Sequence, residues 1–82
     1  MATFRYRSTV LAMLSAHGVL PTPHTRPELV RDFVRDVYKY ELRRLRDRCM
    51  AGEFAKREYS SRVDAVRRRY PVLALRAHEW LD

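Results

Sequence analysis

The chain has 82 residues, of which 46% are hydrophobic and 33% charged, and its formal net charge is +7. This hydrophobic content excludes an intrinsically disordered chain, and the length allows one domain with a small core. Cys49 is the only cysteine, which excludes an internal disulfide framework and predicts a reducing, intracellular compartment. No apolar run has the length that a transmembrane helix needs.

The first predicted helix covers about residues 3–17. Its apolar face is formed by Tyr6, Val10, Met13, Leu14 and His17. These steps of four, three, one and three follow one side of a helix, and Gly18 suits the position after a helix end. No acidic residue precedes Glu28, a composition that mitochondrial transit peptides share. The spacing favours a helix of the folded domain, and a targeting segment is the alternative.

The second predicted helix, about residues 26–51, is the longest. Thr25 and Glu28 have the spacing of a capping box, and Pro27 suits a first helical turn. The predicted core face comprises Val30, Phe33, Val34, Val37, Tyr38, Leu42, Leu45 and Cys49. Gly52 marks the end of the helix. A helix of this length would form the spine of the domain.

The third predicted helix covers about residues 55–70. Tyr59, Val63 and Val66 keep helical spacing, and Pro71 ends the helix because it disfavours the helical conformation of the residue before it. The tail, residues 71–82, is either a short fourth helix or an extended strap. The sequence therefore predicts one all-α domain over residues 1–82, a small three-helix bundle or a long helical hairpin with an N-terminal helix.

Signals for catalysis or metal binding are poor. His17, His24 and His78 lie in separate segments without the spacing of metal ligands. We interpret His17 as a hydrogen-bonded structural residue. Glu41 lies on the apolar flank of the second helix, so we expect an arginine of another helix, Arg7 or Arg62, to pair with it. The sequence predicts no catalytic residue, no metal site and no cofactor.

Basic residues are the strongest functional signal. Arg31, Arg35, Lys39 and Arg43 recur every four residues and form a stripe on the second helix. Like charges at this spacing destabilise an isolated helix by a few tenths of a kcal/mol per pair, so the stripe predicts a surface offered to an acidic partner. The predicted partner-binding residues are Arg5, Tyr6, Arg7, Arg31, Arg35, Lys39, Tyr40, Arg43, Arg44, Arg46, Arg48, Arg67, Arg68 and Arg69. Acidic residues flank the first half of the stripe, so its second half is the less neutralised.

These features predict a non-enzymatic adaptor or accessory assembly subunit. It would dock an acidic protein through its arginines and join a larger complex through the apolar tail around Trp80. The alternative is an RNA- or DNA-binding module, in which Tyr40 stacks on bases among Lys39, Arg43 and Arg44. A homodimer through exposed apolar surface is compatible with either function.

Two local patterns resemble known families. Tyr6-Arg7 followed by Val10-Leu11 resembles the LYR motif of small mitochondrial assembly proteins, with Arg5 in place of the motif's leucine. This resemblance implies a short, basic three-helix protein that assists the assembly of respiratory complexes or iron–sulfur clusters, often by docking an acyl carrier protein. The segment from Leu42 to Tyr59 resembles SHOCT helical hairpins, which implies a role in oligomerisation. The two resemblances imply different compartments, the mitochondrial matrix and the bacterial cytoplasm.

Overall fold

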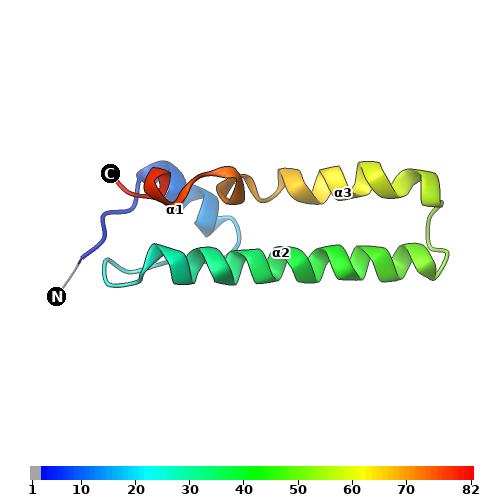
Figure 1. Ribbon diagram of the computed structural model, residues 1–82, viewed down its shortest axis with the longest axis horizontal. Coiled ribbons are helices and arrows are strands. Elements are labelled where there is room, and N and C mark those ends of the chain that lie inside the picture. The colour runs from blue at the N-terminus through cyan, green and yellow to red at the C-terminus, as the bar shows by residue number, and fades with distance from the viewer. Residues whose placement is uncertain (1–2) are drawn as a thin grey trace.

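The computed structural model describes residues 3–82; Met1 and Ala2, which the predicted domain includes, lie outside the described residues. The described chain is all-α, as predicted. Its elements are α1 (Ser8–Ser15), α2 (Pro27–Met50), the 3₁₀ turn η1 (Lys56–Glu58), α3 (Tyr59–Arg68) and two further 3₁₀ turns, η2 (Pro71–Ala74) and η3 (Ala77–Trp80). Figure 1 shows α2 along the whole molecule, with α3 beside one half and α1 and the C-terminal turns beside the other. The body measures 51 × 18 × 17 Å.

The start of α2 differs from the predicted capping box. Arg26 is the N-cap residue and makes no side-chain hydrogen bond to the helix. The Thr25 hydroxyl instead accepts the backbone N–H of Thr22 at 3.0 Å, within the turn that precedes α2. The capping-box prediction was therefore wrong, because the Thr25 hydroxyl bonds within the preceding turn and does not cap α2. Pro27 at the first position and Glu28 in the first turn remain favourable for a helix start.

Glycines end α1 and α2 as predicted. Gly18 and Gly52 have φ values of 73° and 79°, in the left-handed region that side chains with a Cβ disfavour. After Gly52, the N–H of Glu53 donates to the carbonyl of Arg48 at 3.0 Å, which is the long hydrogen bond of a Schellman motif. This ending reverses the chain and directs α3 back along α2.

The N-terminal segment is extended before α1, so helix formation from residue 3 was a wrong prediction. Tyr6 forms an isolated antiparallel bridge with Leu81. The Arg7 N–H donates to the carbonyl of Trp80 at 3.0 Å, and the Asp82 N–H donates to the carbonyl of Arg5 at 2.9 Å, so these bonds hold the two terminal segments together. Figure 1 shows both ends at the same end of the molecule. If α1 began at residue 3, these backbone groups would instead form hydrogen bonds within the helix.

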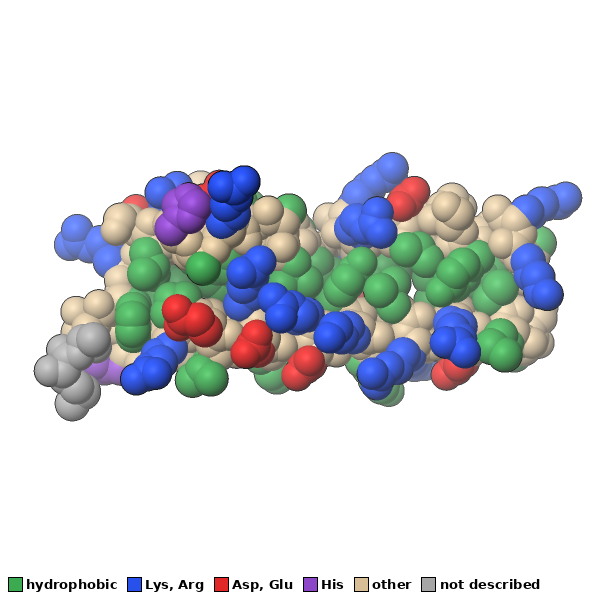
Figure 2. All heavy atoms as spheres, in the orientation of Figure 1, with side chains coloured by type: hydrophobic (Ala, Val, Ile, Leu, Met, Phe, Trp, Pro, Cys, Tyr) green, Lys and Arg blue, Asp and Glu red, His purple; other side chains and the backbone are tan. Residues whose placement is uncertain are grey.

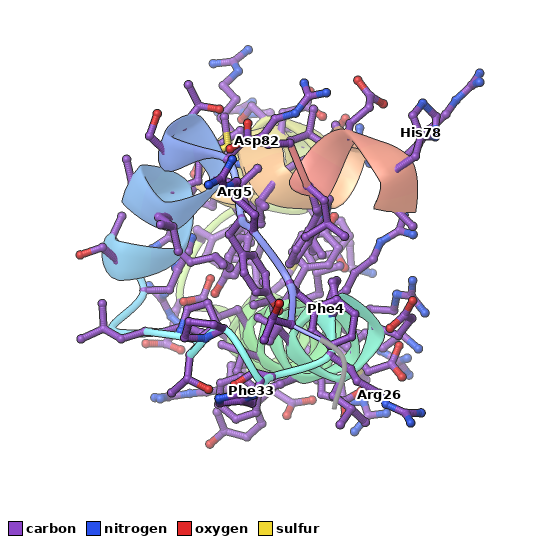
Figure 3. The ribbon with its side chains drawn as sticks, turned by 90° about the vertical axis from the view of Figure 1, so that its left-hand side faces the viewer. Phe4, Arg5, Arg26, Phe33, His78 and Asp82 are labelled. Carbon is purple, nitrogen blue, oxygen red and sulfur yellow. The ribbon has the colours of Figure 1, made fainter. Side chains whose placement is uncertain are left out.

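The core lies between α2 and the opposite layer. Its buried residues are Tyr6, Val10, Leu14, Val30, Val34, Leu45, Val66, Tyr70, Val72 and Trp80. The tail forms short 3₁₀ turns and straps the core, and Trp80 is 0% exposed. Phe33, which was predicted to be buried, is 57% exposed. Figure 3 shows Phe33 pointing away from the other elements, since only one side of α2 is covered.

Across residues 3–82, every helix is too short or too polar to cross a lipid bilayer.

Candidate functional site: an arginine-lined groove

A groove of about 490 Å³ runs between α2 and α3. Its lining consists of Glu41, Arg44, Leu45 and Arg48 from α2, and Arg62, Ala65, Val66 and Arg69 from α3 and its C-cap. Leu45 and Val66 are buried and supply apolar surface, whereas the other large side chains are charged. The antiparallel return of α3 after Gly52 brings these two sets of arginines face to face. The groove therefore combines an apolar base with basic walls.

Three of the groove arginines form ion pairs within the chain. Arg48 Nε lies 3.4 Å from Glu53 Oε2, and Arg62 Nη2 lies 3.4 Å from Glu58 Oε2. All four of these side chains are between 42% and 53% exposed. Ion pairs this exposed contribute at most about 1 kcal/mol each, because water screens them. The guanidinium groups can therefore exchange these partners for an incoming anion at little cost.

An aromatic ring orients two of the arginines. The guanidinium carbons of Arg62 and Arg48 lie 4.1 and 5.9 Å from the centre of the Phe54 ring. Such cation–π contacts contribute about 0.5–1 kcal/mol at exposed sites. Phe54 lies in the connection between α2 and η1, so it fixes both guanidinium groups at the same end of the groove.

Glu41 lies at the other end of the groove. Its Oε2 atom is 3.2 Å from Arg69 Nη2, and it is shielded from solvent without an aligned hydrogen-bond partner. The expected ion pair with an arginine of another segment is confirmed, but the partner is Arg69 rather than Arg7 or Arg62. Burial, and then the neighbouring Glu41 carboxylate, raise the pKa of Tyr70 above its ordinary value of 10.0.

Arg44 forms no ion pair with any residue of the described chain and is exposed. The four groove arginines are otherwise matched by three carboxylates, those of Glu41, Glu53 and Glu58. The groove thus has an excess of one positive charge, located at Arg44. Its lining contains no hydroxyl, thiol or imidazole, and guanidinium groups remain protonated at all ordinary pH values. This arrangement is suited to binding carboxylates or phosphates.

The predicted basic stripe lies on another side of α2. Figure 2 shows Lys and Arg side chains in a row along α2, with acidic side chains gathered at its N-terminal half. In the first half, Arg35 Nη1 lies 3.6 Å from Asp32 Oδ1, and Arg31 is half-buried. Lys39 and Arg43 are exposed and unpaired within residues 3–82. The second half is therefore the less neutralised, as the sequence predicted.

Several other predicted binding residues have structural contacts. Tyr6 is only 7% exposed and donates a hydrogen bond from its hydroxyl to the carbonyl of Thr25 at 2.6 Å. Arg7 donates from Nε to the carbonyl of Leu81 at 2.9 Å. These two residues of the LYR-like motif hold the chain ends together, so we leave Tyr6 out of the candidate surface. The family resemblance itself stays a prediction.

The remaining predicted residues are dispersed. Arg5, Tyr40, Arg46 and Arg68 are exposed at separate positions. Arg67 Nη1 lies 3.5 Å from Asp64 Oδ1, and the Tyr38 hydroxyl beside it raises the pKa of Arg67. Of the predicted set, only Arg44, Arg48 and Arg69 meet in the groove.

Two further sequence interpretations have clear outcomes. His17 donates from Nε2 to the carbonyl of Arg69 at 2.6 Å and stacks on Tyr70 with ring centres 4.3 Å apart. It is thus a hydrogen-bonded structural residue, as interpreted. Within residues 3–82, no group of three or more His, Cys, Asp or Glu side chains is placed to hold a metal ion. Trp80 is fully buried, so its side chain is not available to join a larger complex, contrary to expectation.

Arg62 is the groove residue that sequence reasoning missed as a binding residue. Its four-residue spacing from Glu58 indicates an exposed ion pair within one helix. The register between α2 and α3 places Arg62 opposite Arg48, and no local pattern encodes that register.

Comparison with known proteins finds no protein-family model, no curated protein and no solved structure that matches the chain.

Proposed function

We propose that this protein is a non-enzymatic helical adaptor that docks an acidic segment of a protein partner in the groove between α2 and α3. The observation that carries the proposal is the meeting of Arg44, Arg48, Arg62 and Arg69 around an apolar base. A segment with acidic residues and small apolar side chains would complement both features. Such a partner would place its apolar side chains over Leu45 and its carboxylates against the groove walls.

The chemistry of the walls supports a carboxylate-bearing partner. Guanidinium forks form paired hydrogen bonds with carboxylates, and these are stronger than hydrogen bonds between neutral groups. Arg44 offers a fork that no described residue occupies. The Arg69–Glu41 pair lacks hydrogen-bond alignment at Glu41 Oε2, so a partner carboxylate could replace Glu41 with better geometry. A net charge of +7 would also speed the approach of an acidic protein.

A second candidate function is nucleic-acid binding. Tyr40 is 58% exposed on α2 and is close in sequence to Lys39, Arg43 and Arg44. An exposed aromatic ring among cations is typical of surfaces that stack on bases of single strands. Arg44 belongs to both candidate surfaces, whereas Tyr40 does not line the groove, so the two candidates predict different effects of substitution at Tyr40.

A direct test is the binding of a fluorescein-labelled synthetic peptide of glutamate and leucine, followed by fluorescence anisotropy. We expect Arg44→Glu to weaken binding roughly fivefold or more, because an exposed attractive pair of up to about 1 kcal/mol becomes repulsive. Added salt should weaken binding further. A peptide with lysine in place of glutamate should not bind.

Arg26→Glu is the matched control. It makes the same change in net charge, but it lies at the N-cap of α2, and Figure 3 shows Arg26 at the molecule's edge. Equal weakening by Arg26→Glu and Arg44→Glu would show that only total charge matters, and would contradict docking in the groove. Tighter binding of a single-stranded RNA, weakened by Tyr40→Ala, would favour the second candidate.

A further inference from the structure

The outward side of α2 carries large apolar residues that nothing in the described chain covers. Leu29 is 64% exposed, and Phe33 and Tyr40 are 57% and 58% exposed. Their spacings of four and seven residues place them on one side of the helix. Figure 3 shows Phe33 directed away from the rest of the molecule. Aromatic side chains exposed in such a row are typical of a surface that another helix covers.

The charges beside this row are divided along the helix. The first half of the outward side carries Glu28, Asp32 and Asp36 with one arginine, Arg35, and the second half carries Lys39, Arg43 and Arg46 with one acidic residue, Asp47. All eight residues are exposed. Figure 2 shows the acidic side chains gathered over the N-terminal half of α2. A surface with opposite charges at its two ends is complementary to itself when it is turned end to end.

We propose that two copies of this chain associate through antiparallel pairing of α2, with the two-fold axis close to Val37 and Tyr38. A parallel arrangement would place acidic residues on acidic residues and basic residues on basic residues. The antiparallel arrangement places Asp32 level with Arg43, and Asp36 level with Lys39, of the second copy. It also brings Phe33 within two residues of the level of Tyr40 of the second copy, about 3 Å along the helix, which allows an aromatic contact near the centre of the interface.

The dimensions of α2 suit this interface. The helix has 24 residues, which corresponds to a length of about 36 Å at 1.5 Å per residue. Pairing along this length would bury all three exposed apolar residues of the row. Leu45 of the groove is buried on another side of α2, and Asp32 and Arg43 are not part of the groove lining, so dimerisation can be tested at these two positions without changing the proposed adaptor site.

Charge exchange at positions 32 and 43 tests the pairing. Because of the two-fold symmetry, the contact between Asp32 and Arg43 occurs two times in each dimer. Asp32→Arg and Arg43→Asp should each weaken dimerisation roughly tenfold or more, because two attractive pairs become repulsive. The double variant exchanges the charges within one chain and should restore dimerisation. An equimolar mixture of the two single variants should form a heterodimer.

Analytical ultracentrifugation gives the dimerisation constants, and circular dichroism checks that each variant keeps its helix content. Arg57→Asp, an exposed change in η1 away from the outward side of α2, is the matched control and should leave the constant unchanged. A wild-type chain that stays monomeric up to about 1 mM would overturn the proposal. So would a double variant that dimerises as weakly as the single variants.

Discussion

Removal of the Leu14 side chain tests whether α1 is part of the core. Leu14 is 0% exposed and belongs to the same buried cluster as Val10, Val72 and Trp80. Leu14→Ala would leave a cavity where the short helix α1 packs against the C-terminal turns. The comparison variant is Leu29→Ala, which makes the same chemical change on α2 at a residue that is 64% exposed.

The expected loss for Leu14→Ala is about 3 kcal/mol of the free energy of unfolding, within the range for buried leucines. An 82-residue domain has a total stability of about 4–12 kcal/mol at 0.05–0.15 kcal/mol per residue. The variant should therefore remain folded at 25 °C, with about 1–9 kcal/mol of stability left. Its Tm should fall by roughly 12–24 °C, at 4–8 °C per kcal/mol for a domain of this size.

Urea unfolding followed by fluorescence measures this loss directly. Trp80 is the only tryptophan of the chain and lies in the same cluster as Leu14, so its emission reports on this packing. Leu29→Ala should change the free energy of unfolding by less than about 0.5 kcal/mol, as exposed substitutions do. Similar effects of the two variants would refute the placement of α1 in the core.

Three further predictions concern single positions. Gly52→Ala should cost about 1–2 kcal/mol of stability in thermal unfolding, because its φ of 79° is strained for a residue with a Cβ; an unchanged Tm would refute the Schellman ending. Burial and Glu41 raise the pKa of Tyr70 in the folded protein above its ordinary value of 10.0. The contribution of the protonated Tyr70 to the free energy of unfolding should therefore be fully present below pH 10.0 and be lost as the pH rises through the raised pKa. Tyr70→Phe should make this alkaline loss smaller in urea unfolding at increasing pH, whereas an identical pH profile would contradict the assignment. Glu41→Gln removes the internal competitor for Arg69 and should tighten binding of the acidic peptide about twofold or more in fluorescence anisotropy, with little change in Tm; weaker binding would show that Glu41 is not a competitor.

Much of the fold follows from periodicity and from a few residues that end helices. Gly18, Gly52 and Pro71 end elements near the predicted positions because their conformational restrictions act locally. The extended start of the chain could not be predicted in this way. Tyr6 continues the helical spacing of α1 in the sequence, but its bridge to Leu81 joins segments at opposite ends of the chain.

The burial of individual positions on α2 was less predictable. Phe33 has the hydrophobicity and spacing of a core residue, yet the core contacts that α2 makes are confined to one side. The tail was also ambiguous, because Trp80 is apolar enough for either a buried strap or an external contact. The structure shows that the strap covers the core.

The sequence could indicate that the candidate site is basic, but it could not indicate which arginines form it. The charge excess and the abundance of arginine indicate an acidic partner from composition alone. The groove depends on the register between α2 and α3, which pairs Arg48 with Arg62 across Phe54. Spacing along one helix instead directs attention to the stripe from Arg31 to Arg43.

Docking of an acidic segment between α2 and α3 can be followed residue by residue in a titration of the ¹⁵N-labelled protein with the glutamate and leucine peptide, monitored by amide chemical shifts. We expect the largest shifts within residues 41–48 and 62–69, the two segments that contain the groove lining. Largest shifts confined to residues 29–40 on the outward side of α2, or no shifts with a peptide in excess, would contradict it.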